Sequence, residues 1–192
     1  TRRERSDVKA SDTWSADELL TRARAGESSA FAALVRRYQR TVYSIALRML
    51  SDRHRAEDLA QEVFLQLYRT LDGIDSDTHL AFWLRKVAVN RAIDRMRMES
   101  RHDNEPLTEA VAVADEPIED DPLLHRRMAD LVAQLPPAAR AVVVLRYQED
   151  LDPTDIASTL DMSINTVKSH LKRSLTLLRA RVQGTAIVED IR

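Results

Sequence analysis

The sequence predicts an all-α protein, with two small helical domains joined by an acidic flexible linker and a helix-turn-helix in the second domain. Three observations support this prediction. The 192 residues include only three glycines and few aromatic residues, while Ala, Leu, Arg and Glu are abundant, which favours helices over strands. Apolar residues recur at helical spacing on both sides of one interruption. That interruption, residues 102–123, holds eight acidic residues and no Lys or Arg, as is typical of an extended connector.

Composition excludes several classes of function. The chain has no cysteine, so it holds no disulfide, no thiolate metal site and no cysteine nucleophile. Gly26, Gly73 and Gly184 are too few and too far apart for either glycine-rich nucleotide-binding loop. Glu99 and His102 form one isolated pair at ligand spacing, whereas a di-metal helical bundle needs two such pairs. We therefore expect no metal, no cofactor and no catalytic residues.

The first domain is predicted over residues 15–100, after an arm at residues 1–14 that we expect to be disordered. Its four helices are predicted at residues 15–26, 29–50, 52–71 and 80–98. Ser15 and Glu18 match a capping box at the first of these helices. Ser51 or Asp52 caps the third helix, and a polar loop at 73–78 precedes the fourth. The apolar stripes of these helices are expected to form one small core.

The second domain is predicted over residues 123–183, after the linker at 101–122 and before a tail at 184–192. Its four helices are predicted at residues 123–135, 137–147, 153–160 and 163–182. Asp152 is the expected N-cap of the third, with Pro153 at the first helical position. Asp161 lies in the following turn, where a left-handed backbone is expected.

The distribution of charge points to a polyanion. The formal net charge is only −2, yet residues 82–101 hold six basic and two acidic residues, and residues 163–182 hold five basic and no acidic residues. Two basic segments on either side of an acidic one indicate a protein that binds a polyanion and has an acidic tether. No apolar run is long enough to span a membrane and no signal sequence is visible, so we expect no membrane insertion and a cytoplasmic location.

The segment from Pro153 to Arg173 carries the strongest local signal. A short helix, a tight turn and a longer basic helix form a helix-turn-helix. Such a helix fits the major groove of DNA, where amides and basic side chains read base edges. The alternative is a solvated basic helix in a structural bundle. The predicted DNA-binding residues are Ser163, Asn165, Thr166, Lys168, Ser169, Lys172 and Arg173.

The motifs resemble a known family. Residues 163–171, SINTVKSHL, resemble the DNA-binding helix of bacterial sigma factors and also the output domain of response regulators. Residues 58–64, DLAQEVF, and 82–94, FWLRKVAVNRAID, resemble the second conserved region of extracytoplasmic-function (ECF) sigma factors. A response regulator needs a receiver domain of alternating strands and helices, and no such alternation is present. The chain is therefore identified as a member of the ECF sigma factor family, over about residues 16–100 and 123–182.

The resemblance implies a function and partners. The protein is expected to bind core RNA polymerase, direct it to specific promoters and assist promoter melting for transcription initiation. The alternative is a stand-alone helix-turn-helix regulator that binds duplex DNA without polymerase. The implied partners are the β′ clamp helices and the β flap of the polymerase, promoter DNA, and an anti-sigma factor.

The resemblance also assigns residues to surfaces. The polymerase surface is one face of the helix at 52–71, where three- and four-residue spacing aligns Asp58, Gln61, Glu62 and Leu65. The minus-ten surface comprises Asp75, Ser76, Arg85, Asn90, Arg91, Asp94 and Arg97. The minus-thirty-five surface is the basic helix of the helix-turn-helix. Trp83 is in phase with the apolar stripe, so it is predicted to lie in the core instead of stacking on a base. The linker is implied to run toward the polymerase cleft, and the alternative is a plain tether.

Overall fold

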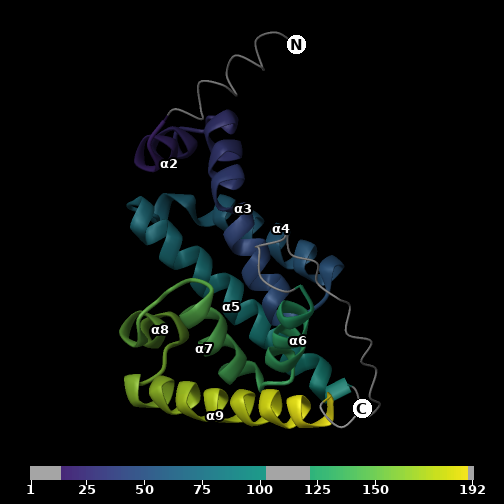
Figure 1. Cartoon of the computed structure of the whole chain (residues 1–192). Coiled ribbons are helices and arrows are strands. Elements are labelled where there is room, and N and C mark those ends of the chain that lie inside the picture. Colours follow the sequence, from purple (N-terminus) through teal and green to yellow (C-terminus); the bar gives the residue numbers. More distant parts are fainter. Residues whose placement is uncertain (1–13, 103–121, 190–192) are drawn as a thin grey trace.

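The computed structural model describes residues 14–102 and 122–189, and every regular element in these two stretches is a helix (Figure 1). This confirms the predicted all-α fold class. The predicted arm, apart from Trp14, lies outside the described residues. So does the predicted linker, apart from its end residues, and its path toward the polymerase stays a prediction.

Side-chain caps start some of the first-domain helices. The elements of this domain are α2 (Ala16–Arg24), α3 (Ser28–Leu50), α4 (Arg53–Thr70), the 3-10 helix η1 (Leu71–Gly73) and α5 (Asp77–His102). The capping box is confirmed, because the Glu18 amide donates to Ser15 Oγ at 3.2 Å and the Ser15 amide donates to Glu18 Oε2 at 2.8 Å. Asp52 caps α4 by accepting a hydrogen bond from the Arg55 amide at 2.9 Å.

Helix α5 begins earlier than predicted. The His79 amide donates to Ser76 Oγ at 3.2 Å, and the Leu80 amide donates to the Ser76 carbonyl at 2.9 Å. Ser76 therefore caps the helix, and Asp77 and Thr78, predicted as loop, are helical. The prediction was wrong here because it took the first apolar residue as the start of the helix.

The second domain consists of four helices: α6 (Pro122–Ala133), α7 (Pro137–Tyr147), α8 (Pro153–Leu160) and α9 (Ile164–Glu189). Asp152 caps α8 as predicted, with its carboxylate accepting from the Thr154 and Asp155 amides at 2.7 and 2.9 Å. These backbone hydrogen bonds hold the pKa of Asp152 below its usual value. Asp161 has φ +51°, which confirms the predicted left-handed residue in the turn.

Helix α9 runs further than predicted. The expected end was near residue 182, with a tail at 184–192, whereas the backbone is helical to Glu189. A glycine inside a helix costs only about 1 kcal/mol relative to alanine. Because no proline follows Gly184, that cost does not end the helix. The part of the predicted tail at 184–189 is therefore helix.

The first-domain core is built around α3, which packs against α2, α4 and α5 (Figure 1). Leu34, Ile45 and Met49 of α3 are fully buried, as are Leu59 of α4 and Leu84 of α5. These residues follow the helical stripes of the sequence. Helix α3 therefore fixes the mutual orientation of α4 and α5, the two helices that carry most of the predicted first-domain site residues.

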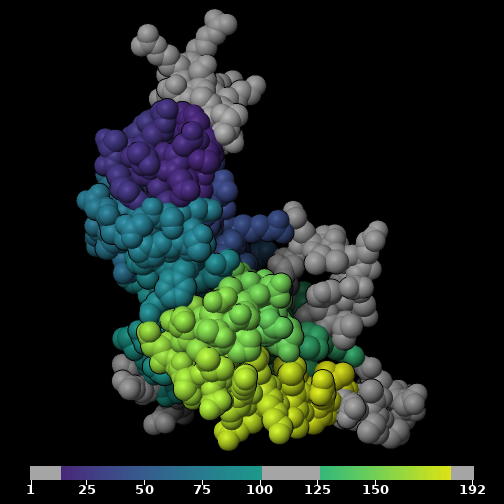
Figure 2. Space-filling model, turned by 90° about the vertical axis from the view of Figure 1, so that its left-hand side faces the viewer, coloured from purple at the N-terminus to yellow at the C-terminus, as the bar shows by residue number. Residues whose placement is uncertain are grey.

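The two domains also pack against each other. Helix α7 contacts α3 and α5, and α8 contacts α5. Figure 2 shows the second domain, in green and yellow, lying directly against the teal surface of the first. Buried residues of the second domain, among them Val142, Leu145 and Ile156, belong to the same apolar cluster as the first-domain core. Helical periodicity predicts the core of each domain but not this contact.

Truncating Leu84 tests the core. Leu84→Ala removes a fully buried side chain, so we expect the free energy of unfolding to fall by about 2–5 kcal/mol. The control is Leu177→Ala, the same truncation at a side chain that is 39% exposed, with an expected loss under about 1 kcal/mol. Urea unfolding followed by circular dichroism measures both. Equal losses would contradict the placement of Leu84.

Candidate functional site

The predicted polymerase residues share one exposed face of α4. Asp58, Gln61, Glu62 and Leu65 are all exposed. Leu65, which is 57% exposed, and Gln61 line an apolar groove of about 700 Å³ between α3 and α4. Asp58 and Glu62 line a second, adjacent hollow together with Arg95 of α5. The face therefore combines an apolar groove with acidic side chains beside it.

Tyr68 belongs to this face, although the sequence analysis missed it. Its side chain is 66% exposed and lines the same groove as Leu65. The ring packs edge-on against Phe31, with 5.1 Å between the ring centroids. Tyr68 follows Leu65 by three residues. The helical spacing that placed the other residues on this face therefore also predicts Tyr68 there.

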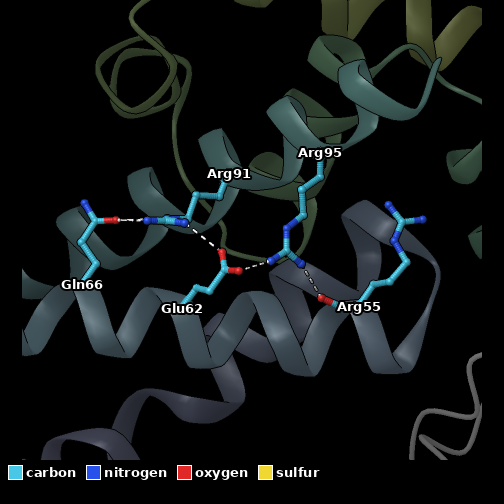
Figure 3. Close-up of polar contacts among 5 residues, drawn as sticks. All are labelled: Arg55, Glu62, Gln66, Arg91 and Arg95. Carbon is cyan, nitrogen blue, oxygen red and sulfur yellow. Dashed lines mark hydrogen bonds and ion pairs between the residues drawn. The ribbon is translucent and has the colours of Figure 1, made fainter. Parts of the chain in front are cut away.

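Glu62 joins the polymerase face to α5. Its two carboxylate oxygens pair with Arg91 and Arg95, each at 2.8 Å (Figure 3). Arg91 also donates to Gln66 Oε1 at 2.7 and 3.0 Å, and Arg95 donates to the Arg55 carbonyl at 3.0 Å. Exposed ion pairs contribute little singly, whereas a network holds its members in one geometry. One residue predicted for polymerase thus touches one predicted for the minus-ten element.

The loop before α5 is fixed by α2 and α3. Arg24 donates a hydrogen bond to the Ile74 carbonyl, and the Tyr38 hydroxyl donates to the Asp77 carboxylate. The Asp77 amide donates to Asp17 Oδ1 at 2.9 Å. Burial, together with Asp77, raises the pKa of Tyr38, which keeps its hydroxyl protonated as a donor. The predicted loop residues Asp75 and Ser76 lie within this anchored segment.

Tyr38 was not among the predicted site residues. It falls within the apolar stripe of α3, so its hydroxyl gave no separate signal. The structure shows a partly buried ring packed on the core, with its polar end on the loop.

The predicted minus-ten residues of α5 divide into two groups. Asn90, Arg91, Asp94 and Arg97 lie within two turns, and Asp94 and Arg97 are exposed. Arg85 lies apart from them, with its Nε 2.9 Å from Glu149 Oε2 of the second domain. Trp83 is partly buried and packs against the core, as predicted.

The basic helix α9 presents its predicted face to solvent. Asn165, Lys168, Lys172 and Arg173 are exposed, and Ser169 is partly buried. Ser163 caps the helix, since its Oγ accepts from the Thr166 amide at 3.0 Å, and Val167 is fully buried beneath. No described residue forms an ion pair with the side chains of Lys168, Lys172 or Arg173. Their positive charge therefore remains accessible to a ligand.

The described residues contain neither a cluster of metal ligands nor a membrane-spanning helix. No group of three or more His, Asp or Glu side chains in residues 14–102 and 122–189 is placed to hold a metal ion. None of the described helices is long and apolar enough to cross a membrane.

Replacing Tyr38 tests the anchored loop. Tyr38→Phe removes only the hydroxyl that donates to Asp77, so we expect about 1 kcal/mol less unfolding free energy. Opening of promoter DNA at the minus-ten element should slow about fivefold, with unchanged affinity for minus-thirty-five duplex DNA. Tyr147→Phe, at a ring that is 60% exposed, serves as the control. Equal losses at both promoter elements would contradict a role in holding this loop.

The structure has the features of a two-domain transcription factor: an acidic and apolar helix face, a basic helix-turn-helix and a shared core.

Comparison with known proteins identifies the family. Residues 34–102 match the family described as Sigma-70 region 2, and residues 125–178 match Sigma-70, region 4. The ECF RNA polymerase sigma factor SigW of Bacillus subtilis (strain 168) is 30% identical over 177 residues, covering 85% of this chain and 95% of the relative. The ECF RNA polymerase sigma-E factor of Haemophilus influenzae is 28% identical over 179 residues, covering 86% and 94%.

Two solved structures share the fold. The sigma factor RpoE from Bartonella quintana, in complex with the anti-sigma factor NepR, aligns with a TM-score of 0.66 at 21% identity, covering 80% of this chain and 96% of that one. CnrH, in complex with the cytosolic domain of CnrY, aligns with a TM-score of 0.65 at 23% identity, covering 88% and 99%.

The chain belongs to the ECF family of RNA polymerase sigma factors. It directs RNA polymerase to promoters, and it binds the core polymerase and promoter DNA. It is not an enzyme, because the chemistry of transcription belongs to the polymerase. This membership excludes the alternative of a stand-alone helix-turn-helix regulator.

Proposed function

We propose that three surfaces of this chain divide the work of initiation. The exposed face of α4 binds the β′ clamp helices, α5 with its preceding loop binds the minus-ten element, and α9 binds the minus-thirty-five element. The observation that carries the proposal is the α4 face, where exposed Leu65 and Tyr68 border a groove next to the carboxylate of Asp58. Large exposed apolar side chains beside a groove mark a surface that a partner covers.

Single-stranded DNA fits the α5 surface. Arg91 and Arg97 supply positive charge for phosphates, while Asn90 and Asp94 supply groups that hydrogen-bond base edges. The anchored loop with Asp75 and Ser76 lies at the start of the same helix, where an unstacked base can be held. Binding unpaired bases lowers the free energy of the melted promoter relative to the duplex, so this surface assists opening.

Duplex DNA fits the α9 surface. Lys168, Lys172 and Arg173 can contact phosphates on either side of the major groove. Asn165, near the start of the helix, is placed to read a base edge, since the first turns of a recognition helix reach the base pairs. A contact of the second domain with the β flap would hold this helix at a fixed distance from the melted region.

An anti-sigma factor is the proposed regulatory partner. The groove beside Leu65 and Tyr68 presents apolar surface whenever polymerase is absent, and a protein that covers it blocks polymerase binding. The Bartonella quintana sigma factor of the same fold forms a complex with an anti-sigma factor, which is consistent with such a partner here. We place the protein in the cytoplasm, where its polymerase and promoters are.

Transcription in vitro tests the three assignments separately. The probe is a promoter selected from a random DNA library by the reconstituted holoenzyme. Asp58→Arg should lose polymerase binding, Arg91→Ala should bind polymerase but open the promoter slowly, and Lys172→Ala should weaken duplex binding. Asp72→Arg, an exposed charge change in η1, is the control for all three assays. The same defect in all three variants would contradict the assignment of three separate functions to the three surfaces.

A further inference from the structure

We propose that the groove where α6 and α7 meet the end of α3 binds an amphipathic carboxylic acid, a molecule with a short hydrocarbon chain and one anionic head. The groove has a volume of about 270 Å³. A methylene group fills about as much space as a water molecule, about 30 Å³, so the groove holds a chain of about eight or nine carbons. Its lining residues belong to none of the three surfaces of the proposed function, so the site is separate from them.

The lining of this groove is mostly apolar. Its larger apolar side chains are those of Leu47 in α3, Met128 and Val132 in α6, and Val143, Val144 and Tyr147 in α7. Sites for small ligands are concave and largely apolar, they often lie between domains, and a few polar groups in them orient the ligand. The groove fits this description, because α3 belongs to the first domain and α6 and α7 belong to the second.

Polar contacts between the domains hold the walls of the groove in place. Gln148, which lines the groove at the end of α7, donates from its Nε2 to Ser44 Oγ of α3 at 2.5 Å. Elsewhere in the interface, Lys86 Nζ of α5 lies 2.8 Å from Asp161 Oδ1, in the turn between α8 and α9. A site that is formed in advance needs less rearrangement when a ligand binds.

The charge around the groove is positive. Arg48 is the only charged side chain among the described residues that line it. Arg140 lies next to the groove, because its Nη1 donates to the Met49 carbonyl and its Nη2 to Oγ of the lining residue Ser51, each at 2.6 Å. The carboxyl ends of α3 and α7 also lie here, and each contributes about half a negative charge. Two arginines and two helix ends therefore leave an excess of about one positive charge.

Arg140 has no anionic partner among the described residues. Its side chain is 4% exposed, and its Nε has no hydrogen-bond partner there. Burial of the guanidinium lowers the pKa of Arg140 to about 10. A buried cation without an anion is unfavourable, and an anion brought close to it is stabilising. The groove therefore favours a carboxylate head beside Arg48 and Ser51, with the hydrocarbon chain along the apolar lining.

Titration with octanoate and with 1-octanol tests the preference for an anion, because the two probes share a chain length and differ in the head. Isothermal titration calorimetry of the full chain measures both affinities. We expect octanoate to bind at one site, about tenfold more tightly than 1-octanol, as a hydrogen bond to a charged group allows. Arg48→Gln and Arg140→Met should each reduce this preference. Arg126→Gln, at an exposed position of α6 outside the groove, should leave it unchanged.

A shorter chain tests burial of the hydrocarbon. Hexanoate has two methylenes fewer than octanoate, and each buried methylene changes the affinity by about fourfold, so hexanoate should bind about 15-fold more weakly. Equal affinities would show that the chain stays in water, which contradicts binding in an apolar groove.

Two further experiments locate the site. Ala129→Phe places a ring in this groove and should abolish binding of octanoate. Ala60→Phe, the same change in the larger groove between α3 and α4, should leave binding unchanged. An octanoate analogue with a photoreactive diazirine in its chain should label peptides of α6 and α7 in the parent protein, and this measurement decides the location if a variant does not fold.

The proposal is overturned if octanoate shows no saturable binding, or if 1-octanol binds as tightly as octanoate. It is also overturned if Ala60→Phe removes binding while Ala129→Phe does not, or if the photoreactive analogue labels only α4. The three surfaces of the proposed function are judged independently, since transcription with the Asp58, Arg91 and Lys172 variants uses no fatty acid.

Discussion

Asp58→Arg combined with Leu65→Asp is expected to weaken binding of core RNA polymerase by about 100-fold or more. Leu65 is 57% exposed beside the groove between α3 and α4, and no described residue forms a hydrogen bond or an ion pair with the side chain of Asp58. A few hot-spot side chains near the centre of an interface cost about 2 kcal/mol or more each when they are truncated, and about 1.4 kcal/mol is a tenfold change in affinity. The aspartate at position 65 would be buried without a partner, and the arginine at position 58 would reverse the charge that this face presents to the clamp helices.

The choice of Asp58 instead of Glu62 follows from the structure. Glu62 pairs with Arg91 and Arg95, so an arginine at position 62 would disturb α5 as well as the polymerase face. Fluorescence titration of labelled protein with core polymerase measures the affinity, and Asp72→Arg is the control for charge. Unchanged holoenzyme formation by a variant with the parent's helical circular dichroism would remove Asp58 and Leu65 from the polymerase surface.

Replacing Lys168, Lys172 and Arg173 together by glutamine is expected to abolish most binding to minus-thirty-five duplex DNA at moderate salt. Each phosphate contact releases about one counterion, so the slope of log affinity against log salt should fall in magnitude by about three. The loss should be similar for every DNA sequence, since phosphates carry no base identity. Arg126→Gln, at an exposed position of α6, is the control. An unchanged salt slope would show that these three side chains do not contact phosphates.

Asn165→Ala distinguishes base recognition from phosphate binding. The amide of Asn165 is exposed near the start of α9, so its loss should change which bases are preferred without changing the salt slope. Selection from a random duplex library by parent and variant measures the preference. If the selected sequences are the same, Asn165 does not read a base.

The features that local chemistry dictates could be predicted from the sequence. Ser15, Asp52 and Asp152 cap helices because their side chains accept hydrogen bonds from amides two or three residues away. Asp161 takes a left-handed backbone for a similarly local reason. The exposed face of α4 followed from three- and four-residue spacing, and only its continuation to Tyr68 was missed.

Features that join distant parts of the chain could not be predicted. Arg85 and Glu149 are 64 residues apart, and Lys86 and Asp161 are 75 apart, so no periodic pattern connects them. Arg140 falls within an apolar run of α7. The sequence shows its charge there, but it does not show that the side chain donates to the Met49 carbonyl at the carboxyl end of α3. The arrangement of the two domains depends on these pairs, and it therefore emerges only from the structure.

Permanganate footprinting of promoter DNA tests the central claim most directly, because it detects unpaired thymines in the melted minus-ten region. With a promoter selected by the holoenzyme, reactive thymines should form only when both core polymerase and this chain are present. Asp58→Arg with Leu65→Asp should abolish the signal, and Asp72→Arg should leave it unchanged. If core polymerase with this chain gives no reactive thymines, or if the signal survives loss of the α4 face, the proposed mechanism is contradicted.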